Sequence, residues 1–193
     1  MKLGFYGHST CAYRSNESFI DLIGTTLDAE IVNVGVRMGS EERSLLDLKK
    51  TKPDIAVVFH SQSRLIYSPN RDYDFDASSD YGLLPNELEM LETYNTYFRD
   101  KELERARLYG AAMQIEQYCN DTNTFVINCV DTAHPFPKWL KLSNEDTKCM
   151  TIAKSNRCDF AQGPNGITSK GNTLIAAHLL NTIAARDGVV KRV

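Results

Sequence analysis

The residues best suited to chemistry in this sequence are one serine and three histidines, each placed where an apolar, strand-like run ends. His8 and Ser9 follow the run KLGFYG, His60 is the last residue of PDIAVVFH, and His134 follows NTFVINCV. A serine hydroxyl is a poor nucleophile until a positioned imidazole takes its proton, and an acid usually orients that imidazole. These residue types therefore indicate acyl transfer, with Ser9 as the nucleophile.

The elements that must position these residues are predicted to form a parallel α/β sheet. Runs rich in β-branched and aromatic residues occur at 2–7, 30–35, 53–60 and 123–130, and amphipathic helical patterns separate them. Successive strand–helix–strand units imply parallel strands, whose carboxyl ends are the usual ligand-binding edge. We expect one domain over 1–193, a flavodoxin-like three-layer αβα sandwich with a mostly parallel sheet of about five strands.

Helical patterns connect and close the predicted strands. The first predicted helix has Ser15 or Asn16 as its N-cap, and the second has Ser40. A long pattern opens with Pro85 at its first position and breaks near Asp100, and its stripe of Tyr and Leu predicts core packing. The run KGNTLIAAHLLNTIAAR closes the fold as an amphipathic helix.

Two stretches have no clear period. Residues 61–85 are rich in Ser, Asn, Asp and Tyr, which is typical of a functional loop insertion following a strand. Between 131 and 162, the run CMTIA fits either a strand or a helix, and CDFA fits a short last strand. The fifth strand is therefore expected in this second stretch.

Taken in order, the strand ends and the closing helix resemble the SGNH, or GDSL-type, hydrolase superfamily. That family opens with a strand and Gly-Asp-Ser, whose serine is the nucleophile; FYGHS keeps Gly7 and Ser9 and has His8 in place of the aspartate. The resemblance implies an ester hydrolase or deacylase that acts on a small acyl ester or an acylated carbohydrate.

The resemblance also implies which groups bind the oxyanion. The family's second block is an N-x-G strand end followed by a glycine whose amide binds the oxyanion, and VNVGVRMGS matches it with Asn33, Gly35 and Gly39. The third block normally supplies an asparagine side chain. The stretch VVFHSQSR has none, and Gln62 or Ser63 is nearest in register.

The last block of the family contains the acid and the base, and this sequence lacks both. The family shows Asp-x-x-His shortly before a KGN-type helix start; aligning KGNTLIA without a gap places Gly163 at the aspartate and Gly166 at the histidine. Two functions stay open: an ester hydrolase with weak or lost activity, and a non-catalytic binding or structural module on the same fold. The short length and divergent blocks resemble SGNH-like proteins of bacteriophage genomes, which implies an accessory or virion role.

A relocated base is the route by which hydrolysis would survive. His134 or His60 could approach the nucleophile from a neighbouring loop, oriented by Asp131 or Asp80. His8 is a poor base for its neighbour, because adjacent residues on a strand point to opposite faces. No i, i+4 or H-x-H spacing groups the histidines, so we expect no metal and no cofactor.

Composition limits the partners and the compartment. The 193 residues carry a net charge of -3, which leaves no broad basic surface for a nucleic acid. Neither a signal peptide nor an apolar run of about 18 residues is visible, which predicts a cytoplasmic protein without membrane contact, or a virion protein if it is phage-encoded. Five cysteines without CxxC or zinc-like spacing indicate free thiols in a reducing compartment.

Overall fold

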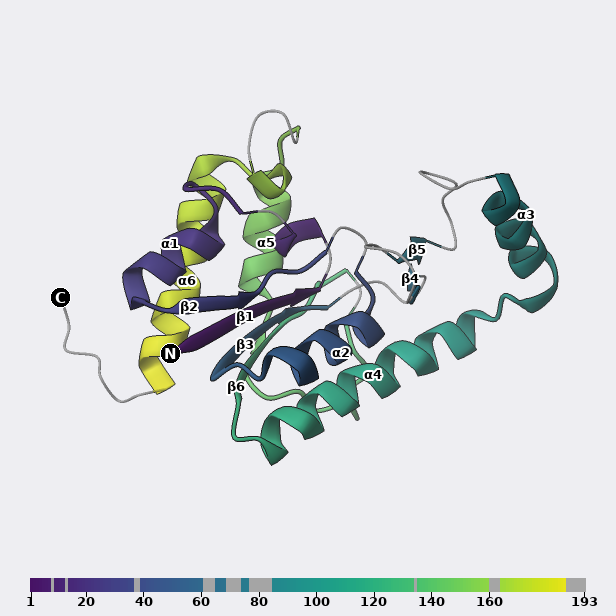
Figure 1. Ribbon diagram of the computed structural model, residues 1–193, viewed down its shortest axis with the longest axis horizontal. Coiled ribbons are helices and arrows are strands. Elements are labelled where there is room, and N and C mark those ends of the chain that lie inside the picture. The colour runs from purple at the N-terminus through teal and green to yellow at the C-terminus, as the bar shows by residue number, and fades with distance from the viewer. Residues whose placement is uncertain are drawn as a thin grey trace.

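The computed structural model describes the chain except residues 8, 13, 37–38, 61–64, 69–73, 77–84, 134, 160–163 and 187–193. Its centre is a five-stranded sheet of order β2-β1-β3-β6-β7, in which every neighbouring pair is parallel (Figure 1). The strands are β1 (Lys2–Gly7), β2 (Glu30–Asn33), β3 (Ile55–Phe59), β6 (Phe125–Cys129) and β7 (Glu145–Asp146). The predicted α/β class and parallel five-stranded sheet are confirmed.

The fifth strand lies within 131–162 as expected, but in neither CMTIA nor CDFA. β7 consists of two polar residues and pairs with the end of β6, Asn128 with Glu145 and Cys129 with Asp146. Cys158 and Asp159, the described part of CDFA, belong to no strand, and CMTIA is helical. A two-residue strand has no hydrophobic alternation of its own, so only its pairing with β6 defines it.

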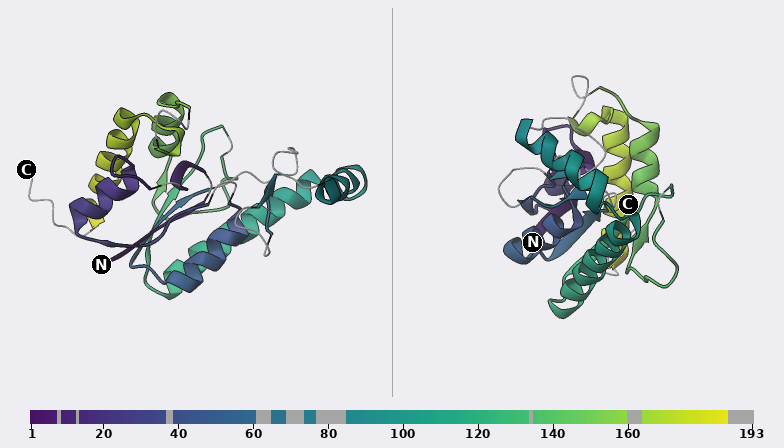
Figure 2. Two further views of the ribbon diagram at one scale, coloured as in Figure 1. Left: turned by 45° about the horizontal axis from the view of Figure 1, so that its top comes forward. Right: turned by 90° about the vertical axis from the view of Figure 1, so that its right-hand side faces the viewer.

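Helices cover both faces of the sheet and give the expected three layers (Figures 1 and 2). On one face lie α1 (Phe19–Leu27), α5 (Lys148–Ser155) and α6 (Ser169–Arg186), and on the other lie α2 (Glu41–Thr51) and α4 (Lys101–Asp121). Strand residues alternate between the two cores, so that Phe5 and Val57 face α1 while Tyr6 and Val58 face α2. Among the residues that the structure describes, no helix combines the length and apolar character needed to cross a membrane.

The helix caps explain where the helices begin. Ser40 caps α2 as predicted, accepting a hydrogen bond from the Arg43 amide. The cap of α1 is Ser18, which accepts from the Asp21 amide, so the prediction of Ser15 or Asn16 is wrong by two or three residues. Ser18 is fully buried, and its position fixes the helix start immediately before the buried Phe19.

The predicted core stripe of Tyr and Leu in the long helical region is wrong, because none of these side chains is buried and α4 packs on the sheet through other residues, mainly alanines and Ile115. α3 (Pro85–Thr93) and the π-helical turn η2 (Tyr94–Phe98) have no buried residue, and Figure 1 shows α3 lying away from the sheet. Tyr97 is 77% exposed, whereas Ile115 in α4 is fully buried against the sheet. The apolar pattern predicted helix correctly but not burial, because burial depends on which elements the helix packs against.

The insertion after β3 contains a small hairpin and is tied to α2. β4 (Leu65–Ile66) and β5 (Phe75–Asp76) pair antiparallel. Asp74 between them is fully buried, and its carboxylate accepts hydrogen bonds from the Ser40 amide at 2.7 Å, the Ser68 amide at 2.8 Å and the Arg43 guanidinium at 2.7 Å. An anion at a helix N-terminus is favoured by the free amides there, so this contact holds the insertion beside the carboxyl ends of the strands.

Candidate functional site at the carboxyl ends of the strands

The predicted nucleophile lies just beyond β1. Gly7 ends the strand with φ of +119°, a conformation that favours glycine, and Ser9 begins the short 3-10 helix η1 (Ser9–Cys11). Ser9 is partly exposed, while Thr10 and Cys11 behind it are buried. Burial raises the pKa of the Cys11 thiol to about 12, which disfavours a thiolate nucleophile at Cys11 and leaves Ser9 as the predicted nucleophile.

The second block packs directly against this turn. Asn33 donates a side-chain hydrogen bond to the Phe5 carbonyl at 2.7 Å, which ties the end of β2 to β1. A Cβ on Gly35 would lie 2.4 Å from Cys11 Sγ, and a Cβ on Gly39 would lie 2.6 Å from the Gly7 carbonyl oxygen. Only glycine allows such an approach, so these two glycines are needed to hold the loop against the serine turn.

The amide of Gly39 is used inside this loop. It donates to the Val36 carbonyl at 3.1 Å, and the Val36 amide in turn donates to the Gly7 carbonyl at 3.2 Å. An oxyanion donor must point its N–H at the substrate oxygen. In this conformation the Gly39 amide closes a turn instead, and it would serve an oxyanion only after that turn opens.

The segment before α6 lies where the family resemblance expects the base. The 3-10 turn η3 (Pro164–Gly166) packs against η1, so this part of the chain does return to the serine turn. Gly166 has φ of +63° and its carbonyl accepts from the Cys158 amide, while Asn165 beside it is buried. The described part of this turn therefore brings a glycine and an amide side chain to the serine turn, and no imidazole or carboxylate.

His60 is held in a buried polar network. Its Nδ1 lies 3.3 Å from Glu41 Oε1 and its Nε2 lies 2.9 Å from Asn128 Oδ1. The Asn128 amide group is fixed in orientation, because its Nδ2 donates to Glu116 at 3.1 Å and to the Ser143 carbonyl at 2.6 Å. Asn128 Oδ1 can only accept, so His60 Nε2 must carry a proton.

The charge around His60 favours a second proton. Burial alone lowers the pKa of His60, but the Glu41 carboxylate and the hydrogen bonds from both partners outweigh burial and raise the pKa above its usual value of 6.5. With both nitrogens bonded, His60 is better suited to joining α2 to β6 than to taking a proton from Ser9. The role of alternative base predicted for it is not supported by these contacts.

The remaining predicted site residues fall into two groups. Asp131, one of the two predicted orienting acids, forms an ion pair with Lys154 at 2.6 Å. The others lie outside the described residues, namely His8, Gln62, Ser63, Asp80, His134 and Gly163.

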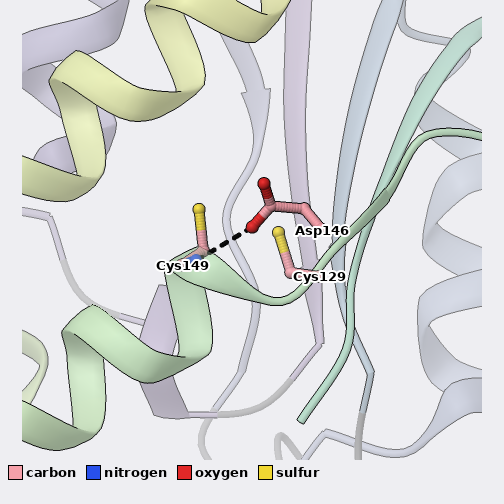
Figure 3. A group of neighbouring side chains, drawn as sticks. All are labelled: Cys129, Asp146 and Cys149. Atoms are coloured by element: carbon pink, nitrogen blue, oxygen red, sulfur yellow. Dashed lines mark hydrogen bonds between the residues drawn. The ribbon is translucent and has the colours of Figure 1, made fainter. Parts of the chain in front are cut away.

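A second polar cluster, which the sequence did not single out, lies on the α6 side of the sheet. Cys129 at the end of β6, Asp146 in β7 and Cys149 in α5 have ligand atoms within 4.8 Å of one another (Figure 3). His178 Nε2 in α6 forms a short hydrogen bond with Asp146 Oδ2. The spacing D-x-x-C at 146–149 is the one local signal that could have drawn attention to this cluster.

The two acidic groups of this second cluster differ in their electrostatics. Burial and the neighbouring Cys149 raise the pKa of the Cys129 thiol well above its ordinary value. Burial also works to raise the pKa of Asp146, but hydrogen bonds from the Cys149 amide and from His178 outweigh it and lower that pKa below 3.8. Asp146 is therefore an anion that these two donors hold in place.

Known proteins resemble this chain in fold but not in sequence. No protein-family model matches the chain, and no curated protein does. Among solved structures, the psychrotrophic esterase EstA from Pseudoalteromonas sp. superposes with a TM-score of 0.53 at 9% identity, covering 97% of this chain and 98% of that one.

Two larger esterases have the same fold over part of their length. One is the acetyl xylan esterase Est2A from the rumen bacterium Butyrivibrio proteoclasticus, with a TM-score of 0.50 and 11% identity over 98% of this chain. The other is a carbohydrate esterase whose active site is described as having divergent catalytic and non-catalytic binding functions, with a TM-score of 0.50 and 10% identity over 95% of this chain. This chain covers 64% of each of these two proteins. The fold is the one found in SGNH-type esterases.

Proposed function

We propose that the protein is a relative of SGNH-type serine esterases that binds a small acyl ester or an acylated carbohydrate at the Ser9 turn and hydrolyses it slowly. The observation that carries this proposal is the packing of η3 against η1, which brings Gly166 rather than a base to the serine turn. The described part of this turn brings no imidazole or carboxylate to the serine turn, and an esterase without a positioned base keeps only the modest rate advantage of binding and orientation.

A second candidate is a non-catalytic binding or structural module, the accessory or virion role included. The Gly39 amide favours it, because this donor is bonded to Val36 and is not presented to a substrate. The carbohydrate esterase with a non-catalytic binding function supports the idea that this fold can bind without turnover. The two candidates differ in one measurable property, which is turnover that depends on Ser9.

The experiment supplies a base from solution. Wild type, Ser9→Ala and the exposed control Ser155→Ala are treated with a fluorophosphonate probe and assayed with p-nitrophenyl acetate, with and without added imidazole. We expect wild type and Ser155→Ala to be labelled and to show an imidazole-dependent rate above that of Ser9→Ala, because free imidazole can take the serine proton. Equal rates and no labelling in all three proteins would exclude the hydrolase.

Binding is measured separately on the same three proteins. An acetylated xylo-oligosaccharide is titrated calorimetrically, with its deacetylated form as the control ligand. If the slow-hydrolase proposal holds, Ser9→Ala binds the acetylated ligand about as tightly as wild type and leaves it uncleaved. Acetyl-dependent binding without any Ser9-dependent turnover in wild type would assign the protein to the second candidate.

A further inference from the structure

The cluster of Cys129, Asp146 and Cys149 is fixed by backbone pairing. Cys129 and Asp146 are register partners across β6 and β7, and the Asp146 carboxylate accepts from the Cys149 amide at 2.9 Å. Figure 3 shows the three side chains converging from β6, β7 and the first turn of α5. Both sulfurs are fully buried and the ligand atoms lie within 4.8 Å of one another.

His178 holds the carboxylate of this cluster from a different element. Its Nε2 is hydrogen-bonded to Asp146 Oδ2, while the Cys149 amide donates to Asp146 Oδ1. The His178 side chain is 22% exposed, and it lines a pocket of about 500 Å³ together with Asn144, Thr182 and other residues of α6. This pocket reaches His178, the hydrogen-bond partner of Asp146.

The three side chains of the cluster form a donor set with a recognised preference. Two thiols and one carboxylate are among the groups that bind Zn²⁺ in tetrahedral sites. In a tetrahedral site, ligand atoms about 2.3 Å from the ion lie about 3.8 Å apart, so the three atoms, which lie within 4.8 Å of one another, would have to approach by up to about 1 Å to share one ion. A cation would also supply the positive charge that a buried thiolate lacks in this core.

We propose that Cys129, Asp146 and Cys149 bind one divalent cation of the zinc class, with His178 hydrogen-bonded to the Asp146 carboxylate. The ion would join β6, β7 and α5 and so stabilise the far edge of the sheet. The proposal departs from the sequence-based expectation of no metal, which rested on the spacing of the histidines. Here strand pairing brings together Cys129 and Asp146, which are 17 residues apart in the chain. It does not depend on the proposed role of Ser9.

The test is metal binding by the full chain. Reduced protein is loaded with Zn²⁺ or Co²⁺, desalted, and analysed for metal content and for the thiolate-to-cobalt charge-transfer absorption. We expect one ion per chain, and an affinity lower by about 10–100-fold or more in Cys129→Ser, Cys149→Ser and Asp146→Asn. Cys119→Ser is the matched control, because Cys119 is an equally buried thiol in the core on the other face of the sheet.

The outcomes separate the ion from its alternatives. No stoichiometric ion in wild type, or the same cobalt spectrum in Cys149→Ser as in Cys119→Ser, would overturn the proposal. A mass lower by two hydrogens after aerobic purification, with no metal bound after reduction, would assign the pair to a disulfide. If the cysteine variants do not fold, Asp146→Asn still decides, because its side-chain oxygen can accept from the Cys149 amide while it binds a cation more weakly. Ser9→Ala must bind the ion as wild type does, so failure of the esterase proposal leaves this one testable.

Discussion

Among the described residues, two carboxylate–histidine pairs lie on opposite faces of the sheet, and their surroundings differ. Glu41 and His60 belong to the α2 and α4 side, where their side chains are 2% and 3% exposed. Asp146 and His178 belong to the α6 side, where the exposed fractions are 11% and 22%. The first pair is therefore enclosed, whereas the second pair is more open and its His178 lines a pocket.

The difference lies in what else each imidazole contacts. His60 has partners at both ring nitrogens, and its neighbour Asn128 is itself bonded to Glu116 and Ser143. His178 meets Asp146, whose second oxygen holds the amide of a cysteine. The contacts of His60 link helices to the sheet, whereas the contacts of His178 belong to a cluster of polar side chains around Asp146. A buried histidine–carboxylate pair is thus not by itself a sign of catalysis.

The largest expected effect comes from removing the charge of the enclosed pair. In Glu41→Gln the buried imidazolium loses its counterion, and we expect the free energy of unfolding to fall by about 3 kcal/mol. This is the lower part of the range for such pairs, because the glutamine oxygen can still accept a hydrogen bond. Urea unfolding at pH 6 measures it.

The neighbouring residue provides the control. Glu42→Gln removes the same charge one position along α2, where the ion pair with Arg107 is about one-third exposed on each side. We expect a change below about 1 kcal/mol, as is usual for exposed pairs. Equal losses in the two variants would mean that the enclosed network does not stabilise the fold in the way described.

The sequence predicted the strands, helices and fold class better than it predicted the contacts between side chains. The runs at β1, β3 and β6 and the cap at Ser40 could be recognised because their patterns are local. β7 could not, since two polar residues become a strand only through pairing with β6. The fold of SGNH-type esterases followed from the order of the motifs, which is a property of the whole chain.

The sequence was likewise limited in predicting the partners of the candidate site residues. The sequence placed His60 at a strand end correctly, but not Glu41 and Asn128 around it, which lie 19 and 68 residues away in the chain. It also assigned Gly166 to the turn that meets η1, because the helix start KGNTLIA fixed the alignment there. The partners of a side chain depend on tertiary packing, and no local pattern records them.

The open pair should respond less than the enclosed one. In Asp146→Asn the charge that faces His178 is lost, but the amide oxygen can still accept from the Cys149 amide. We expect a loss of about 1.5 kcal/mol in the free energy of unfolding without added metal, typical of one hydrogen bond to a charged group. A loss as large as that of Glu41→Gln would contradict the view that solvent already relieves this pair.

The two pairs should also lose their stabilising effect at opposite ends of the pH scale. This is the smallest expected effect, because it reports only the part of each interaction that is linked to one proton. That part amounts to about 1.4 kcal/mol for each unit of pKa shift. The pKa of His60 is raised above 6.5, so its contribution is complete below pH 6.5 and is lost as pH rises through the folded-state pKa. The pKa of Asp146 is lowered below 3.8, so its contribution is complete above that pH and is lost as pH falls through the folded-state pKa. Unfolding free energies measured across pH should therefore show the gap between wild type and His60→Gln closing toward alkaline pH, and the gap between wild type and Asp146→Asn closing toward acid. If both gaps close in the same direction, one of the two charge assignments is wrong.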